Sequence, residues 1–420
     1  MISLFQVPSF VLAFSLFIPL LARIKTPHER LYRILFFIPV FYLFWLNISL
    51  SYLDGGIFSE EIGLFTSRSY AWLRVLLLSL TFITITRLAF SMQSWDLVRT
   101  FSKEQSFFEK FIFCAIPLYV ITLFFNLPCF PCVINRTIFY QSENFIFFLL
   151  KYIDLISLLI GYFLALVIDD TAKKVERLYL IISIIVLFAT FITLGHKFSQ
   201  FVHFIYIFLI GFSLKVIWFK RFLHLFVFLV VLFLVTFLLY KIKNDLFFFE
   251  FVDIISKRIL SYQGQFAWLI DSYWIKSNSQ VNLISFRDFV INAIDYNNIT
   301  IKYLMNTTLG ISKSAFILNS GTILSGAFPS VFLVLSKYIL VCILAMVIYS
   351  VIFSFFLLKL IYEIRNRQLF FVILLFCVFY PWMTFLFNAD ISAFLGINYY
   401  LKLISCLAVH FFYHYYKKNK

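Results

Sequence analysis

The chain has 420 residues, of which 63% are hydrophobic and only 13% are charged. This composition excludes an ordinary soluble domain, in which about 25% of residues carry charge. The net charge of +15 does not indicate nucleic acid binding, because much of the Lys and Arg lies in short links between apolar runs. The sequence therefore predicts an all-α polytopic membrane protein.

Apolar runs of about 20 residues, the length that crosses a bilayer as a helix, predict about eleven transmembrane helices. The first run lacks the short apolar core and the small-residue cleavage site of a removable signal peptide, so we count it as a transmembrane helix. The predicted helices lie near 2–22, 34–53, 70–90, 110–128, 145–168, 178–195, 200–218, 222–240, 330–358, 369–387 and 398–416.

Basic residues cluster in alternate links between these helices, and such links face the cytoplasm. We therefore expect the N-terminus outside and the C-terminus in the cytoplasm. The six clusters are Arg23 to Arg33, Arg99 with Lys103, Lys173 to Arg177, Lys220 with Arg221, Lys359 to Arg367, and Lys417 to Lys420.

One stretch of almost ninety residues, Lys241 to Ala327, is too polar to cross a bilayer and falls on the outer side. The predicted organisation is an N-terminal bundle of about eight helices (1–240), an outer helical loop (241–329) and about three C-terminal helices (330–420). The loop carries eight Lys or Arg against six acids. Long loops cross the membrane largely regardless of charge, but an anionic ligand at the outer face would also explain the basic residues.

Within the loop, residues 246–274 have the pattern of one or two amphipathic helices at the membrane interface, with Trp268 and Trp274 at headgroup level. Arg258, Tyr262 and Gln265 fall on one helical face. This polar stripe either faces water or binds a phosphate next to sugar hydroxyls.

Gly264 lies inside this pattern, where Gly costs about 1 kcal/mol relative to Ala. Its presence indicates a close backbone approach, either to a ligand or to another helix. The rest of the loop, 285–297 and 301–318, has the pattern of short amphipathic helices.

A second candidate at the outer face is the turn at 195–198, sequence GHKF. Lys197 on so short a turn is well placed to hold an anion, and His196 can exchange a proton near neutral pH. Alternatively, Lys197 only extends to the lipid headgroups.

Ionisable residues inside apolar runs are functional candidates by default, because they are costly in a bilayer. Lys151 and Asp154 are three residues apart and can pair on one helix face, where an interhelical structural role is favoured over a proton relay. Arg74, Arg87 and Lys215 lie near helix ends, from which they can extend to the headgroups.

The chain contains one C-x-x-C, Cys129 to Cys132, for which a disulfide or redox role is a minor alternative. Zinc, ATP and dinucleotide motifs are missing from the sequence, so we expect no metal and no cofactor.

Three segments, GHKF at 195–198, RILSYQGQFAW at 258–268 and GAFPSVFL at 326–333, together resemble the Wzy-type O-antigen polymerases of Gram-negative bacteria. The similarity covers about the middle half of the chain. Some members carry Arg followed eleven positions later by Gly, and this chain departs from that pattern. Its Arg136, Arg258 and Arg287 are followed at that distance by Phe147, Leu269 and Asn298.

The resemblance implies a multi-pass inner-membrane glycosyltransferase whose large loop is periplasmic. Its substrate would be an oligosaccharide repeat unit on undecaprenyl pyrophosphate, with membrane lipids around it and a flippase and a chain-length regulator as further partners. The growing glycan is transferred to the non-reducing end of a new lipid-linked unit. An O-antigen ligase and a lipid-linked oligosaccharide flippase are the alternatives, and the large outer loop argues against the flippase.

Displacing a lipid pyrophosphate requires stabilisation of the negative charge that develops on the leaving group. Arg258 and Lys197 are the residues predicted to do this, with His196 or Asp271 as the base for the acceptor hydroxyl. The predicted substrate-binding residues are Tyr262, Gln263, Gln265, Trp268, Asp271, Arg287 and Arg136.

Overall fold

The computed structural model describes the chain in segments. These are residues 27–54, 58–59, 63–64, 70–92, 107–125, 152–169, 174–193, 198–212, 247–257, 263–277, 305–306, 308–309, 312–315, 328–334, 336, 338–389, 394 and 396–418.

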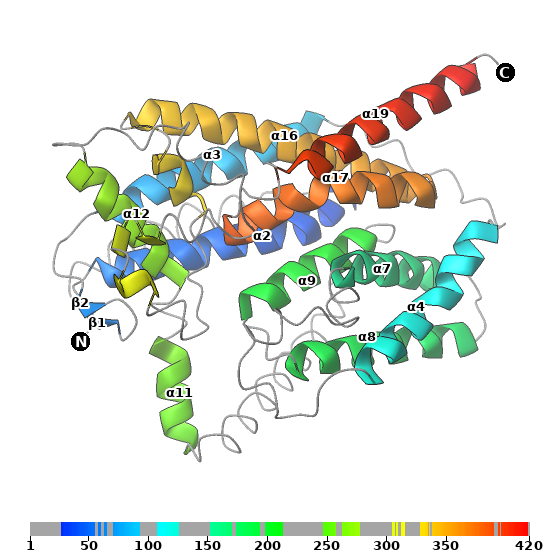
Figure 1. Cartoon of the computed structure of the whole chain (residues 1–420), viewed down its shortest axis with the longest axis horizontal. Helices are drawn as coiled ribbons and strands as arrows, with labels where there is room; N and C mark the ends of the chain where they lie inside the picture. Colours follow the sequence, from blue (N-terminus) through cyan, green and yellow to red (C-terminus); the bar gives the residue numbers. More distant parts are fainter. Residues whose placement is uncertain are drawn as a thin grey trace.

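Apart from one pair of two-residue strands, the regular elements described are helices (Figure 1). The strands β1 (Phe58–Ser59) and β2 (Gly63–Leu64) pair antiparallel. The helices are α2 (Pro27–Leu53), α3 (Ala71–Met92), α4 (Phe107–Phe125), α7 (Ile153–Asp169), α8 (Lys174–Thr193), α9 (Phe198–Gly211), α11 (Phe248–Lys257), α12 (Gln263–Ser277), η4 (Ser330–Val334), α16 (Ile339–Arg365), α17 (Leu369–Asn388) and α19 (Ile397–Lys418).

Four of the described helices, α3, α4, α16 and α17, are long and apolar enough to cross a membrane. Helices suit apolar runs in lipid because every backbone N–H and C=O must be bonded within the protein. At 1.5 Å per residue the 27 residues of α16 extend about 40 Å, more than the roughly 30 Å of a hydrocarbon core. The predicted α-helical class is confirmed.

The eleven predicted spans are only partly matched. Helices near 70–90, 110–128 and 369–387 occur close to the expected positions, but α16 begins nine residues after 330, because η4 occupies the start of that run. Shorter apolar helices occupy Ile38–Leu53, Ile153–Leu166, Val202–Gly211 and Ile397–Val409, and α8 overlaps the run at 178–195. The runs 2–22 and 222–240 lie outside the described residues.

The helices form two groups (Figure 1). In the larger group α3 packs on α16, α2 on α12 and α3, and α17 on α16 and α19. In the smaller group α7 packs on α8 and α9, and α4 packs on α7 and α8. Helix α9 also contacts α2, α16 and α17, so it joins the two groups. Helices from all three predicted segments of the chain therefore pack together in the larger group.

Buried aromatic rings fill the interior of the larger group. Phe328, which directly precedes η4, is fully buried, and its ring centroid lies 5.8 Å from Phe82 of α3 and 5.2 Å from Tyr349 of α16. Phe385 of α17 lies 5.7 Å from the same ring. Such edge and tilted ring pairs stabilise beyond the area that they bury. The end of the long loop is thus part of the bundle core.

Two glycines allow α7 and α9 to pack at very short range. A Cβ atom on Gly161 would lie 2.3 Å from the carbonyl oxygen of Phe208, and one on Gly211 would lie 2.3 Å from that of Leu158. Small residues at helix crossings let two backbones approach closely, which is the usual basis of helix association in membranes. The close packing of α7 on α9 therefore depends on the absence of side chains at Gly161 and Gly211.

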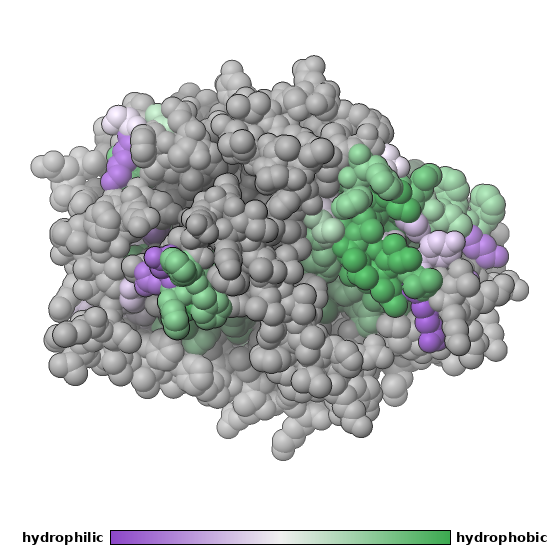
Figure 2. Space-filling view, turned by 90° about the horizontal axis from the view of Figure 1, so that it is seen from below, coloured by the Kyte–Doolittle hydropathy of each residue, from purple (hydrophilic) through white to green (hydrophobic). Residues whose placement is uncertain are grey.

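The surface of the smaller group is strongly apolar. Figure 2 shows an apolar area on the side where α4 and α8 lie in Figure 1. Exposed side chains there include Phe111 and Leu118 of α4, and Ile181 and Ile185 of α8. A contiguous apolar surface of this kind marks an interaction with a membrane or a partner. Because α4 and α8 are strongly hydrophobic, contact with lipid is the simplest explanation of their exposed apolar side chains.

Candidate functional site

The described part of the candidate site is α12, the helix that begins in the motif at 258–268. It lies against α2, α3 and η4 at one end of the larger group (Figure 1). Its residues Phe266, Ala267 and Ile270 are almost completely buried. The structure confirms a helix here and shows that it packs against other helices, and its place at the membrane interface stays a prediction. Its sequence contains enough apolar residues for an interfacial helix, but those residues pack against other helices.

Gly264 brings α12 into direct contact with α2. Its backbone N–H donates to the Ser49 hydroxyl at 2.8 Å, and a Cβ atom at this position would lie 2.7 Å from Ser49 Oγ and 2.9 Å from the Leu50 nitrogen. Any side chain larger than hydrogen would collide with the backbone of α2. Of the two predicted reasons for this glycine, the structure shows approach to another helix.

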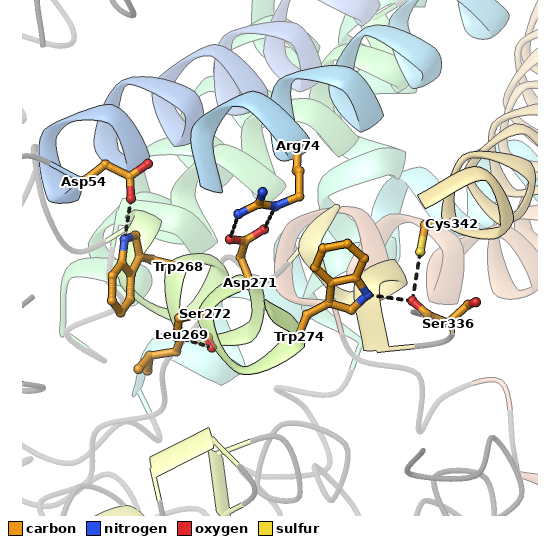
Figure 3. Close-up of polar contacts among 9 residues, drawn as sticks. All are labelled: Asp54, Arg74, Trp268, Leu269, Asp271, Ser272, Trp274, Ser336 and Cys342. Atoms are coloured by element: carbon orange, nitrogen blue, oxygen red, sulfur yellow. Dashed lines mark hydrogen bonds and ion pairs between the residues drawn. The ribbon is translucent and has the colours of Figure 1, made fainter. Parts of the chain in front are cut away.

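Trp268 fixes α12 to the end of α2. Its indole Nε1 donates to Asp54 Oδ1 at 2.6 Å, and its side chain is buried (Figure 3). Asp54 follows the last residue of α2, and its backbone N–H donates to the Leu50 carbonyl. The ring is therefore packed between helices, and its location at headgroup level stays a prediction. A hydrogen bond to a charged acceptor is among the stronger ones in proteins.

An ion pair joins α12 to the first turn of α3. The Arg74 guanidinium donates through Nε and an Nη nitrogen to the two Asp271 oxygens, each at 2.5 Å (Figure 3). Asp271 is fully buried, whereas about a fifth of the Arg74 side chain is exposed. The guanidinium also lies 5.6 Å from the Trp274 ring centroid. Such a two-bond pair satisfies both partners, and removing either one would leave a buried charge.

These contacts bear on two predicted residues. Arg74, for which an extension to the headgroups was expected, pairs with a residue 197 positions later in the chain. Asp271, predicted as a base or substrate ligand, has both carboxylate oxygens bound by Arg74. In this arrangement Asp271 positions α12.

The last turns of α12 contact the segment before α16. Trp274 Nε1 donates to the Ser336 carbonyl at 2.7 Å, and the Cys342 thiol lies 3.5 Å from the same oxygen (Figure 3). The Ser336 hydroxyl in turn accepts the backbone N–H of Tyr338 at 3.0 Å. Four separate polar contacts thus hold α12 to α2, to the end of α2, to α3 and to the segment before α16.

The other predicted site residues are only partly visible. Gln265 is buried within α12, and Gln263 is the first residue of that helix. The remaining six lie outside the described residues: Arg258, Tyr262, His196, Lys197, Arg287 and Arg136. Lys151 and the two cysteines Cys129 and Cys132 also lie outside them. Of the predicted set, the structure therefore places Gln265, Trp268 and Asp271 as buried residues of α12.

Sequence reasoning missed the partners of α12. Asp54 and Ser49 were not predicted as contact residues, because an acid or a serine near the end of an apolar run is common. Arg74 was noticed, because a charge within an apolar run is unusual. The sequence contained a signal that Arg74 needs a partner, but it did not contain the identity of that partner.

No family model, curated protein or solved structure shows significant similarity to this chain. The case for a function consequently depends on the residues and their arrangement.

Proposed function

We propose that the chain is a polysaccharide repeat-unit polymerase of the O-antigen type. In the proposed reaction, a hydroxyl at the non-reducing end of a new lipid-linked unit attacks the anomeric carbon of the growing glycan. A C–O bond forms there, the bond to undecaprenyl pyrophosphate breaks, and a base takes the hydroxyl proton. The enzyme would be a metal-independent membrane glycosyltransferase with a polyprenyl pyrophosphate donor.

The observation that supports this proposal most is the anchoring of α12. The segment RILSYQGQFAW continues directly into α12, which is held by four polar contacts at one end of the bundle. Catalysis of group transfer requires the reacting groups to be held within fractions of an ångström of their working geometry, and rigid elements do this better than loops. An anchored helix directly after Arg258 to Tyr262 suits that requirement.

Arg258 and Lys197 would neutralise the charge that develops on the departing pyrophosphate. Tyr262, Gln263 and Gln265 would supply hydrogen bonds to sugar or phosphate oxygens. His196 is the preferred candidate for the base, because Asp271 is bound to Arg74.

The proposal includes a location. The chain would lie in a bacterial inner membrane with the α12 end of the bundle at the periplasmic face and the C-terminus in the cytoplasm. A lipid-linked repeat unit would reach the site after a flippase has moved it across the membrane.

The test replaces Arg258 in a strain that lacks the chromosomal gene. Arg258→Ala should abolish long glycan and leave single repeat units on the lipid A core, because the leaving group loses its main counter-charge. Lys257→Ala is the matched control, since it removes the same charge one position earlier, at the end of α11. Glycan length on extracted lipopolysaccharide is the readout, and protein amount in the membrane must be equal. Normal glycan length in Arg258→Ala would refute the role of this residue.

The deletion strain separates the alternatives. Loss of a polymerase leaves one unit on the core, loss of a ligase leaves none there while long lipid-linked glycan accumulates, and loss of a flippase traps single units on the cytoplasmic leaflet. Either of the last two outcomes would replace the proposal.

A further inference from the structure

Three polar side chains meet where α9 joins the two groups of helices. The Tyr380 hydroxyl of α17 donates to Asp154 Oδ2 in the first turn of α7, and His203 Nδ1 of α9 lies 3.7 Å from Asp154 Oδ1. The His203 ring centroid is 5.7 Å from that of Tyr380. His203 is 7% exposed. We name these three residues the junction cluster.

The junction cluster is incompletely hydrogen-bonded. His203 Nε2 and the Tyr206 hydroxyl are buried and have no hydrogen-bond partner in the structure as described. His203 and Tyr206 are three residues apart, so they share one face of α9. Both rings contact Phe387 of α17, at centroid distances of 5.5 and 5.9 Å. Buried polar atoms in native proteins nearly always have a partner, so an open nitrogen here indicates a site for a proton or a bridging water.

One proton on His203 would make the junction cluster neutral. A lone carboxylate is costly inside an apolar bundle, and a positive imidazole beside Asp154 would make the pair neutral. The described titratable groups that face the cluster from neighbouring helices are phenols, which are uncharged near neutral pH. Four of them are Tyr119 of α4, Tyr152 before α7, Tyr206 of α9 and Tyr380 of α17. The other two are Tyr349 of α16, which faces Tyr206, and Tyr42 of α2, whose hydroxyl donates to the Phe387 carbonyl.

We propose that Asp154, His203 and Tyr380 form a buried proton-binding site that joins the two groups of helices. A proton from bulk water bonds to the His203 imidazole, and the resulting imidazolium faces Asp154 Oδ1 while Oδ2 keeps its hydrogen bond from Tyr380. The pair changes from one negative charge to zero. The protonated cluster holds α7 to α9 more firmly than the unprotonated one, because the attraction between the imidazolium and Asp154 acts across the contact of those two helices.

The test observes His203 directly, in the full chain in lipid nanodiscs with ¹⁵N-labelled histidine. His203→Gln identifies its signal among those of the six histidines of the chain. We expect one His signal that titrates and whose midpoint falls by about one pH unit or more in Asp154→Asn, because an opposite charge within about 4 Å stabilises the protonated ring. Tyr42→Phe is the matched control: it removes another buried phenol hydroxyl near Phe387, outside the cluster, and should leave the midpoint unchanged.

A second measurement covers the case in which Asp154→Asn does not fold. Infrared difference spectra of the wild-type chain should show a carboxylate band that shifts in the pH range in which His203 titrates, and the shift should be absent in His203→Gln. A His203 signal that does not change between pH 4 and 9, an unchanged midpoint in Asp154→Asn, or a band shift that persists in His203→Gln would each overturn the proposal. Neither readout involves glycan transfer, so failure here leaves the proposed polymerase activity untouched.

Discussion

Two polar regions of this protein hold helices together through different kinds of contact. At the end of the larger group, α12 is held by the Arg74–Asp271 pair, the Trp268–Asp54 bond and the Trp274–Ser336 bond. At the junction, Asp154 has one phenol bond and a histidine at 3.7 Å, and His203 Nε2 has no hydrogen-bond partner among the described residues.

The comparison separates a fixed contact from an adjustable one. A bidentate ion pair makes two parallel N–H···O bonds, so it holds one geometry. A carboxylate beside a histidine has two states, one with a neutral imidazole and one with a protonated imidazole. The first kind suits the support of a reaction site, and the second suits a response to pH.

The largest expected effect is at the fixed contact. Asp271→Ala should destabilise the protein by about 3–5 kcal/mol, because it leaves the Arg74 guanidinium without its partner in a mostly buried position. Thermal unfolding of the purified protein in detergent measures the change. The double variant Arg74→Met with Asp271→Leu should recover much of the loss, since it removes both charges together. If Asp271→Ala were as stable as the wild type, the ion pair would not be the anchor described here.

A smaller effect is expected where α12 meets α2. Gly264→Ala should cost about 1–3 kcal/mol, because its Cβ would collide with Ser49 and with the Leu50 backbone nitrogen. Gly396→Ala is the control, since a Cβ there meets nothing within 4 Å. The same thermal unfolding assay applies to both variants, and equal midpoints for the two would contradict the close approach of α12 to α2.

The smallest effect is expected at the junction. Tyr380→Phe should cost about 1.5 kcal/mol, the low end for a hydrogen bond to a charged group, because His203 still faces the Asp154 carboxylate. A loss as large as that in Asp271→Ala would mean that the junction is as rigid as the α12 anchor. In that case the distinction between the two regions would disappear.

Much of the fold could be predicted from the sequence, because long apolar runs have few structural options. The helices near 70–90 and 369–387 were expected almost where α3 and α17 occur. The location of α12 could not be predicted, because an apolar stripe looks the same whether it faces lipid or other helices. The same limit explains why the burial of Trp268 between helices could not be predicted.

For the candidate site, the chemical character of single residues could be predicted from the sequence, but the residues with which they pair could not. Gly264 indicated a close approach, which occurs to α2, and Arg74 was flagged as an unusual charge, but its bond to Asp271 joins residues 197 positions apart. Arg258 and Lys197, the predicted pyrophosphate ligands, lie outside the described residues, so their roles stay predictions.

The sequence by itself determined the α-helical membrane class, because 63% hydrophobic residues in runs of bilayer length must bond their backbones internally. It also determined where charge is costly and therefore needs a partner. Only the tertiary structure decided that Arg74 meets Asp271 and that Asp154 meets His203 and Tyr380. The physical reason is that hydrophobic burial is nearly non-directional and can be anticipated from composition. An ion pair or hydrogen bond depends instead on how distant helices pack to within a few ångströms.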